Sequence, residues 1–247
     1  MKLKIIGTGS KGNAYILENE NEALLIECGV DFKKVKQALN FNLNKVVGCI
    51  LTHEHGDHAK SILHCLEAGL TIWSGEKTHE KLQTTMHHNS GILKPEKIQK
   101  IGGFKILPFL VEHDAAEPLG FLINHAETGN ILFLTDTFYC KNTFRNLNNI
   151  IIEANYSKKI IDDKVSNGAS PQFLRDRILM SHLSLENCME LLIANDLSSV
   201  NNIVLIHLSD SNSNAKGFKS AIEKLTGKTV TIADSGMTIE NFNKTPF

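Results

Sequence analysis

Three histidines and one aspartate fall within the six residues HEHGDH: His53, His55, Asp57 and His58. Imidazole nitrogens and carboxylate oxygens are ordinary zinc ligands, and an exposed loop gains no packing from collecting them. Side chains alternate along an extended segment, so His53 and His55 share one side, while Asp57 and His58 follow where a helix begins and point back toward the same pocket. Four ligands in one loop suit two neighbouring ions better than one. The spacing therefore predicts a dinuclear zinc centre, with the first two ligands on one ion and the last two on the other.

Three further candidate ligands stand at the ends of apolar runs elsewhere in the chain. His113 follows FLVE, Asp136 follows LFLT and His207 follows VLI, so each lies where a buried strand would emerge at the edge of a sheet. We expect His113 to complete the first site and His207 the second, with the two oxygens of Asp136 bridging both ions. Any of these alone is more often a half-buried residue with an ordinary partner, so the prediction depends on their joint occurrence behind HxHxDH. The other histidines considered lack a partner pattern and are expected at the surface or on helix faces: His64, His79, His87, His88 and His125.

The elements that must position these residues are short. Apolar and alternating runs predict strands at 2–6, 13–18, 22–27, 46–52, 70–74, 96–101, 104–113, 119–125, 130–136, 149–154, 202–208 and 229–234. Helical patterns cover 61–69, 76–86, 170–180, 183–196 and 216–227. Strands crowd first and then alternate with helices in both halves, which predicts stacked sheets flanked by helices, an α/β sandwich. Neither a linker nor a repeat is visible, so we expect one domain over 1–247.

A glycine-rich segment near the start imitates a nucleotide-binding motif. Gly7, Gly9 and Gly12 match GxGxxG after a strand, and Glu27 falls near the acidic position of that fingerprint. The fingerprint requires a helix to begin at the glycines, whereas 13–27 alternates and contains a turn at 18–22. We therefore predict a tight strand-to-strand turn and reject the dinucleotide-binding fold.

Composition favours a small ligand and a reducing compartment. The formal charge is -1, from 26 basic and 27 acidic residues, whereas proteins that neutralise many phosphates usually carry a basic excess or stripe. The five cysteines are odd in number and form no CxxC pair, which predicts reduced thiols. The sequence has no signal-peptide pattern and no apolar stretch of ~20 residues. We expect a cytoplasmic protein.

The chain resembles the metallo-β-lactamase superfamily over essentially its whole length. The resemblance is carried by an ordered set of residues: Glu27 in LLIECG, the HxHxDH motif, His113, Asp136 and His207. The resemblance implies a four-layer αβ/βα sandwich with the metals at one edge between two β-sheets. The first motif of that family usually carries aspartate, as in LIDAG. In this chain Glu27 takes that place, and the resemblance implies that it supports the metal-binding loop.

Four segments select a branch of this superfamily. They are similar to segments of the YycJ-type and tRNase Z-like phosphodiesterases, and they read GSKGNAYIL, IEANYS, SHLSLEN and IHLSDSN. Small size, near-neutral charge and the lack of an inserted polymer-gripping domain resemble the phage anti-Pycsar group, which destroys the cyclic pyrimidine nucleotides of bacterial antiviral signalling. The resemblance implies a homodimeric hydrolase of cyclic nucleotides such as cyclic CMP and cyclic UMP, acting in the host cytoplasm.

Phosphodiester hydrolysis needs a nucleophile, charge neutralisation at phosphorus and a proton for the leaving oxygen. Two Zn²⁺ ions, or Mn²⁺ in their place, would acidify a bridging water and clamp the phosphoryl oxygens. We assign a catalytic role to Asp57, besides metal binding, and to His182 as general acid. His182 precedes a helix whose expected N-cap is Ser184. On residue chemistry alone His182 is equally a half-exposed histidine beside a helix cap, and the SHLS resemblance favours the catalytic role.

Other functions fit parts of the sequence. A single-strand exonuclease, as expected for YycJ-type proteins, would need a cationic track, which the sequence does not reveal. Processing of tRNA 3′ ends would need an inserted Gly- and Pro-rich arm, which the sequence lacks. β-Lactam hydrolysis would need a signal peptide, and a glyoxalase-like thioesterase would need an extra C-terminal helical region; neither is visible. A metal-bearing scaffold that binds without cutting would lack a ligand, and seven candidates are present. We therefore expect a small phosphodiester substrate, with no membrane partner and no stable nucleic-acid complex.

Overall fold

The computed structural model describes residues 1–245, which form two seven-stranded sheets. The order of the first sheet is β14 (Thr238–Ile239), β1 (Lys2–Gly7), β2 (Ala14–Glu18), β3 (Ala23–Ile26), β4 (Val46–Ile50), β5 (Ile72–Ser74) and β6 (Ser90–Ile92). The order of the second is β13 (Val230–Ile232), β12 (Asn202–Ile206), β11 (Leu147–Glu153), β10 (Gly129–Leu134), β9 (Leu119–His125), β8 (Phe104–Leu110) and β7 (Gln99–Ile101).

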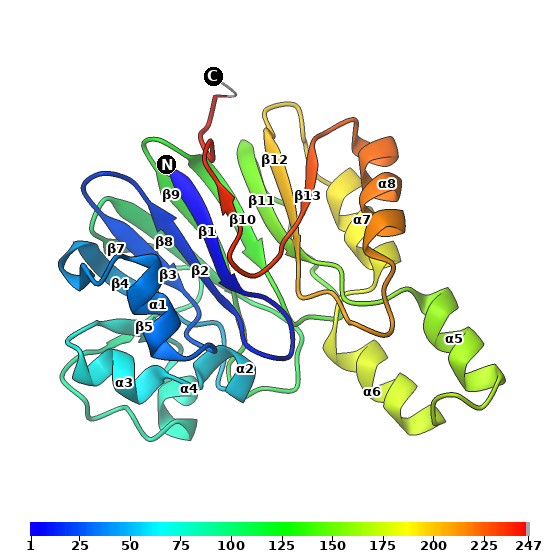
Figure 1. Ribbon diagram of the computed structural model, residues 1–247, viewed down its shortest axis with the longest axis horizontal. Coiled ribbons are helices and arrows are strands. Elements are labelled where there is room, and N and C mark those ends of the chain that lie inside the picture. The colour runs from blue at the N-terminus through cyan, green and yellow to red at the C-terminus, as the bar shows by residue number, and fades with distance from the viewer. Residues whose placement is uncertain (246–247) are drawn as a thin grey trace.

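Helices cover the outer faces of both sheets. Figure 1 shows α1 and α3 beside the first sheet, α7 and α8 beside the second, and α5 with α6 projecting from the body. The helical elements are α1 (Phe32–Ala38), a 3₁₀ turn η1 (Leu43–Lys45), α2 (Gly56–Ala59), α3 (Ile62–Glu67), α4 (Glu76–Lys81), α5 (Lys158–Ser166), α6 (Gln172–Ser181), α7 (Leu185–Ile193) and α8 (Ala215–Thr226). No helix within residues 1–245 is both long enough and apolar enough to cross a lipid bilayer.

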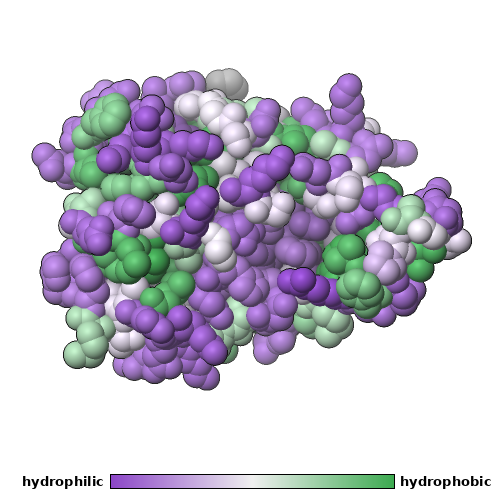
Figure 2. Space-filling model, turned by 60° about the horizontal axis from the view of Figure 1, so that its bottom comes forward, coloured by the Kyte–Doolittle hydropathy of each residue, from purple (hydrophilic) through white to green (hydrophobic). Residues whose placement is uncertain are grey.

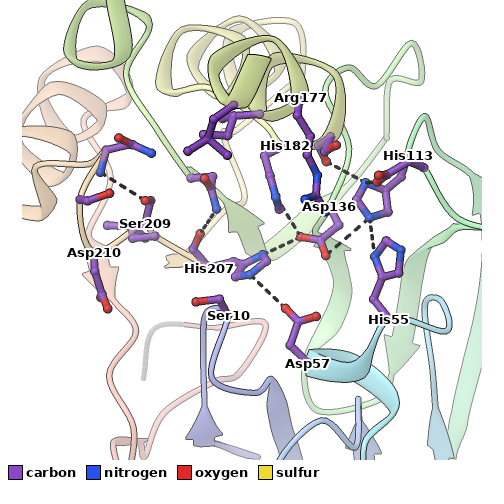
Figure 3. Close-up of a pocket in the computed structure, with 18 of the residues that line it drawn as sticks. Ser10, His55, Asp57, His113, Asp136, Arg177, His182, His207, Ser209 and Asp210 are labelled. Carbon is purple, nitrogen blue, oxygen red and sulfur yellow. Dashed lines mark hydrogen bonds and ion pairs between the residues drawn. The ribbon is translucent and has the colours of Figure 1, made fainter. Parts of the chain in front are cut away.

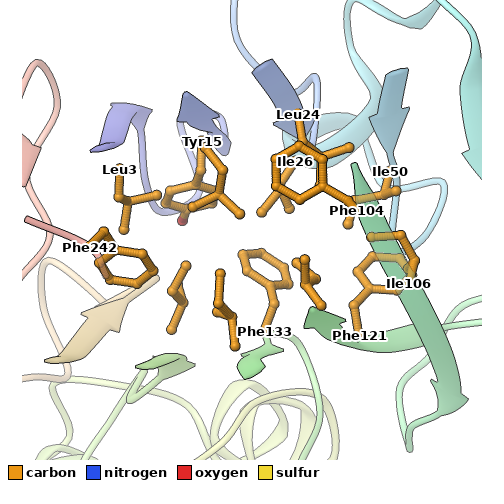
Figure 4. Close-up of a cluster of buried hydrophobic side chains, with 14 of the residues drawn as sticks. Leu3, Tyr15, Leu24, Ile26, Ile50, Phe104, Ile106, Phe121, Phe133 and Phe242 are labelled. Atoms are coloured by element: carbon orange, nitrogen blue, oxygen red, sulfur yellow. The ribbon is translucent and has the colours of Figure 1, made fainter. Parts of the chain in front are cut away.

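The main hydrophobic core lies between the sheets, because alternating side chains of both sheets point inward (Figure 4). Tyr15 packs edge-on against Phe133, with 5.6 Å between ring centroids. Two further cores join the outer face of each sheet to its helices: one lies around Val35 and Cys65, the other around Leu192 and Ile222. Helix, sheet, sheet and helix therefore form four layers, which confirms the predicted αβ/βα sandwich.

Parallel pairing brings the carboxyl ends of several strands to the same edge. Strands β3 to β6 are parallel to one another in the first sheet, and β10 to β13 are parallel in the second. The remaining neighbours are antiparallel, including β1–β2 and β2–β3. Segments that leave the parallel strands therefore meet at one place, where ligands bind in many α/β proteins.

The predicted strands and helices are present with shifted ends. The helix expected over 76–86 ends at Lys81, and the GxGxxG segment forms a turn between β1 and β2, as predicted. The sequence patterns did not predict α1, η1, α5, β6 or β14, whereas α2 begins at Gly56, beside the expected start of a helix at Asp57 and His58. Helix α1 is seven residues long and buries only Phe32 and Val35, and α5 buries only Ile161, so neither presents a clear apolar stripe. The five cysteines are free thiols.

Candidate metal centre

The site begins where the parallel strands end. Glu27 directly follows β3, Asp136 lies two residues beyond β10 and His207 directly follows β12. Their backbone φ angles are 65°, 46° and 53°, in the left-handed region that costs a non-glycine residue about 1–3 kcal/mol. Three such residues at one edge indicate that the chain turns sharply out of each strand to aim a polar side chain at a common point.

The HxHxDH loop rests on the segment that leaves β3. The backbone N–H of Cys28 donates to the carbonyl of His58 at 2.9 Å, and that of Asn13 donates to the carbonyl of Asp57 at 2.7 Å. A Cβ atom on Gly29 would lie 1.7 Å from the Asp57 carbonyl oxygen, so only glycine permits this approach. The segment 27–29 thus fixes the position of the HxHxDH loop relative to the first sheet.

His53, His55 and His113 form the first donor group. Nδ1 of His55 lies 3.1 Å from Nε2 of His53 and 3.1 Å from Nε2 of His113. Two nitrogens bound to one tetrahedral zinc ion at about 2.0–2.1 Å lie about 3.3 Å apart. The nitrogen spacing therefore fits a shared ion.

The outer nitrogens of this group test the fit further. Nδ1 of His113 donates to the Ser181 carbonyl at 2.8 Å, and Nδ1 of His53 lies 2.9 Å from the Thr52 hydroxyl. With those nitrogens protonated, both Nε2 atoms present lone pairs to His55, whose Nδ1 carries at most one proton. Three converging nitrogens with too few protons between them fit a cation at their centre.

Asp57, His58, Asp136 and His207 form the second donor group. Oδ2 of Asp57 lies 3.5 Å from Nε2 of both His58 and His207. Oδ2 of Asp136 lies 2.8 Å from Nε2 of His58 and 3.4 Å from Nε2 of His53, so this carboxylate stands between the two groups. The structure thus brings together all seven predicted ligands, in the two sets expected.

Opposite charges hold this second group in ionised form. Burial alone would raise the pKa of Asp57, but its contacts with His207 and His58 outweigh burial and hold the pKa well below its usual range. Burial likewise opposes the charge of Asp136, and the charges of His207 and His58 again keep its pKa low. By contrast, burial lowers the pKa of His53. Burial alone would lower the pKa values of His58 and His207, but Asp136 raises them, so a cation bound by this group would take the place of their protons.

A carboxylate supports the loop from beneath, in the place expected for Glu27. The side chain is fully buried, with Oε1 accepting from the Thr52 N–H at 3.3 Å and Oε2 lying 3.4 Å from Nδ1 of His58. Burial raises the pKa of Glu27, and the charge of His58 opposes that rise. The longer glutamate side chain therefore still reaches a histidine of the loop.

Glu153 is the site residue that the sequence reading missed. It ends β11, is fully buried, and its Oε1 lies 2.8 Å from Nδ1 of His182 and 3.1 Å from Nδ1 of His207. Its Oε2 accepts from the Leu183 N–H at 3.0 Å. A carboxylate at the end of the run NIIIE was the available signal, because a fully buried strand rarely ends in an unpaired charge.

His182 follows α6 and lies beside both donor groups, with its side chain 24% exposed. Nδ1 is held by Glu153 and lies 3.4 Å from Oδ1 of Asp136, which leaves Nε2 as the nitrogen available to the pocket. Burial alone would lower the pKa of His182, but the charge of Glu153 and bonds with Asp136 and Glu153 raise it to about 9. Ser184 caps α7 as predicted, accepting from the Asn187 N–H at 3.0 Å.

An open pocket of about 590 Å³ lies over the cluster. Figure 3 shows Asp136 at its centre, between His207 and Asp57 on one side and His113 and His55 on the other. Two histidines expected at the surface or on helix faces are buried away from it. His79 contacts Thr84 and His125 lies 3.2 Å from Glu22.

Known proteins resemble this chain in sequence and in fold. A family model described as a beta-lactamase superfamily domain matches residues 22–208. Exodeoxyribonuclease WalJ of Streptococcus pneumoniae serotype 2 is 28% identical over 227 residues, covering 85% of this chain and 82% of that protein. Exodeoxyribonuclease YycJ of Bacillus anthracis is 26% identical over 227 residues, covering 86% and 84%. The metallo-beta-lactamase fold protein YhfI of Bacillus subtilis superposes with a TM-score of 0.72 at 17% identity, covering 97% of this chain and 99% of that one.

Proposed function

The chain belongs to the beta-lactamase superfamily and is a metal-dependent hydrolase, and on that basis we propose that it cleaves nucleotides from the ends of single-stranded DNA. Two relatives carrying the name exodeoxyribonuclease align over more than four fifths of their length and support this substrate class. The cyclic mononucleotide substrate expected from the sequence receives no support from the relatives. The exonuclease alternative therefore replaces it as the main proposal.

One observation carries the proposed chemistry: two donor groups meet at Asp136, with His182 beside them at an open pocket. His53, His55 and His113 would hold one zinc ion, and Asp57, His58 and His207 a second, with Asp136 between them. When bound, the ions supply Lewis acidity at phosphoryl oxygens and lower the pKa of water. The nitrogen-rich donor set favours zinc, whereas manganese prefers more oxygen ligands.

The protein's own side chains would orient the phosphodiester and manage its protons. Glu153 fixes His182 through Nδ1, so Nε2 faces the pocket and can hand a proton to the leaving oxygen. The Glu153 carboxylate also contacts Nδ1 of His207. It therefore holds His182 next to a histidine of the second metal-binding group. We assign the general-acid role to His182 and the positioning role to Glu153.

A hydrolysis panel tests the proposal. Zinc-loaded protein is incubated with 5′-phosphorylated single-stranded DNA, cyclic CMP, cyclic UMP, precursor tRNA and a chromogenic β-lactam, and products are separated by chromatography. An Asp136→Asn variant purified in parallel controls for contaminating nucleases. We expect release of mononucleotides from the DNA by the wild-type protein alone. Cleavage of the cyclic nucleotides with intact DNA would overturn the exonuclease proposal and restore the cyclic-nucleotide one.

Two further expectations accompany this function. The resemblance implies a homodimer, which sedimentation of the purified protein would test. A cytoplasmic location stays a prediction from the reduced cysteines, which fluorescence of a tagged protein in cells would check.

A further inference from the structure

Arg177 is an exposed arginine on α6 that forms no ion pair with any carboxylate of residues 1–245, yet it lines the pocket over the metal centre. Arg175, two residues earlier on the same helix, pairs with Asp162 at 2.5 Å and with Asp176 at 3.0 Å. Residues two apart on a helix point in different directions. Arg175 therefore fastens α6 to α5, whereas the Arg177 guanidinium is free for a ligand.

The position of Arg177 relative to the metal centre follows from the helix. Helix α6 ends at Ser181 and leads directly into His182, so Arg177 stands five residues, or about 7.5 Å of helix rise, before the histidine. Both residues line the same pocket. Figure 3 shows Arg177 extending from α6 over the pocket, on the His113 side of His182.

The carboxylates at the rim of this pocket already have partners. Asp114 lies 3.3 Å from Nδ1 of His113, and Asp210 lies 3.5 Å from Nζ of Lys11. Asp57 and Asp136 belong to the donor groups. Arg177 is therefore a lining cation whose charge no described carboxylate neutralises, close to but separate from the place where the metals would act.

The wall around Arg177 is apolar. Leu174 and Ile178 line the same pocket, three residues before Arg177 and one after it, while Phe173 is 74% exposed one turn earlier. Figure 2 shows hydrophobic side chains gathered over α5 and α6 at the right, next to a hydrophilic surface at the centre. The Arg177 guanidinium therefore lies beside exposed apolar side chains. This combination suits a nucleic-acid strand, because phosphates can pair with the guanidinium while sugars and bases contact the apolar groups.

Building on the proposed function, we propose that Arg177 binds the phosphate next to the scissile one in a single DNA strand. The guanidinium fork pairs with two oxygens of that phosphate, while Leu174 and Ile178 contact the intervening sugar and base. A cyclic mononucleotide has one phosphate and cannot occupy the metal centre and Arg177 together. The residue thus selects substrates with successive phosphates, which is the local cationic contact that the sequence alone did not reveal.

Calorimetric binding of two small nucleotides tests this selection without relying on nuclease activity. Thymidine 5′-monophosphate carries one phosphate and thymidine 3′,5′-bisphosphate carries two, and neither contains a phosphodiester bond to cut. Each is titrated into zinc-loaded wild type, Arg177→Ala, Arg177→Lys and Arg175→Ala. We expect wild type to prefer the bisphosphate by about tenfold, Arg177→Ala to lose that preference, and Arg177→Lys to keep part of it. Arg175→Ala should keep it, because its exposed ion pairs contribute little.

Three results would overturn the inference. Wild type could bind both nucleotides within about twofold, Arg177→Ala could retain the preference, or it could weaken both nucleotides equally, which would place Arg177 at the phosphate held by the metals. If the preference depends on Arg177 but the hydrolysis panel shows no DNA cleavage, the exonuclease proposal fails and the second phosphate site stands.

Discussion

At the level of single residues, Asp136 is the carboxylate that joins the two donor groups. It is buried, adopts a left-handed backbone conformation, and its two oxygens contact histidines of both donor groups. Burying this charge and holding the backbone in the left-handed region each destabilise a fold by about 1 kcal/mol or more. A cation shared with those histidines would offset the cost, so the site residues are explained by binding and not by stability.

The proton-donor assignment makes a residue-level prediction. Replacing His182 with asparagine should lower kcat for a phosphodiester by about 10²–10⁴-fold, because general acid catalysis typically contributes that much. Metal content measured by elemental analysis should stay at the wild-type level. If the substitution instead removes metal, His182 is a ligand, consistent with its place near Asp136 and Glu153 in a third possible donor set.

Glu27 supports a second residue-level prediction. Glu27→Gln removes the charge that lies 3.4 Å from Nδ1 of His58 and should weaken metal retention by about 10–100-fold, as changes beneath a ligand usually do. Retention is measured by dialysis against graded chelator concentrations. Glu22→Gln is the matched control, because Glu22 makes a similar pair with His125 far from the donor groups. Equal retention in both variants would refute the supporting role.

Among the secondary-structure elements, the first sheet is joined to η1 by a charged cluster. Glu18 of β2 bonds to Lys4 of β1, and to Lys45 of η1 at 2.8 Å, with all three side chains at most 19% exposed. Burial alone would raise the pKa of Glu18, but the two lysines outweigh it and lower the pKa. The cluster therefore stabilises the fold only while Glu18 is ionised.

The lowered pKa of Glu18 predicts how the stability of the fold depends on pH. A group with a lowered folded pKa contributes its full stability above its unfolded pKa, about 4.3 for glutamate, and loses it as the pH falls through the folded value. At pH 7, Glu18→Gln should cost about 1 kcal/mol, since the lysines remain partly solvated. Urea unfolding should show this difference shrinking as the pH falls below about 4. A difference that stays constant with pH would contradict the assignment.

Some of the elements could be predicted from the sequence and others could not. The strands were predictable because apolar runs such as 149–154 and 202–208 are buried between two layers. Helix α5 was missed because its polar sequence buries only Ile161. Helix α6 was predicted as a helix, but its role as a pocket wall depends on where it lies in the folded chain, and its sequence pattern does not give that position.

Across the whole molecule, seven candidate ligands were predictable because parallel strands deliver their carboxyl ends to one edge. Glu153 was not predicted, because a single carboxylate after an apolar run is a weak signal that many ordinary strand ends share. Substrate choice was not predictable either, because the pocket combines Ser10 from the first sheet's turn, Arg177 from α6 and Ser209 from the loop after β12. Only the folded chain brings these three segments together.

This pocket should hold metal, and the metal content of the purified protein tests that most directly. Elemental analysis should find about two transition-metal ions per chain in the wild type and clearly fewer in a His53→Ala variant whose free energy of unfolding by urea has been checked. Less than one ion per chain in zinc-supplied wild-type protein, or the same content in both proteins, would contradict the account.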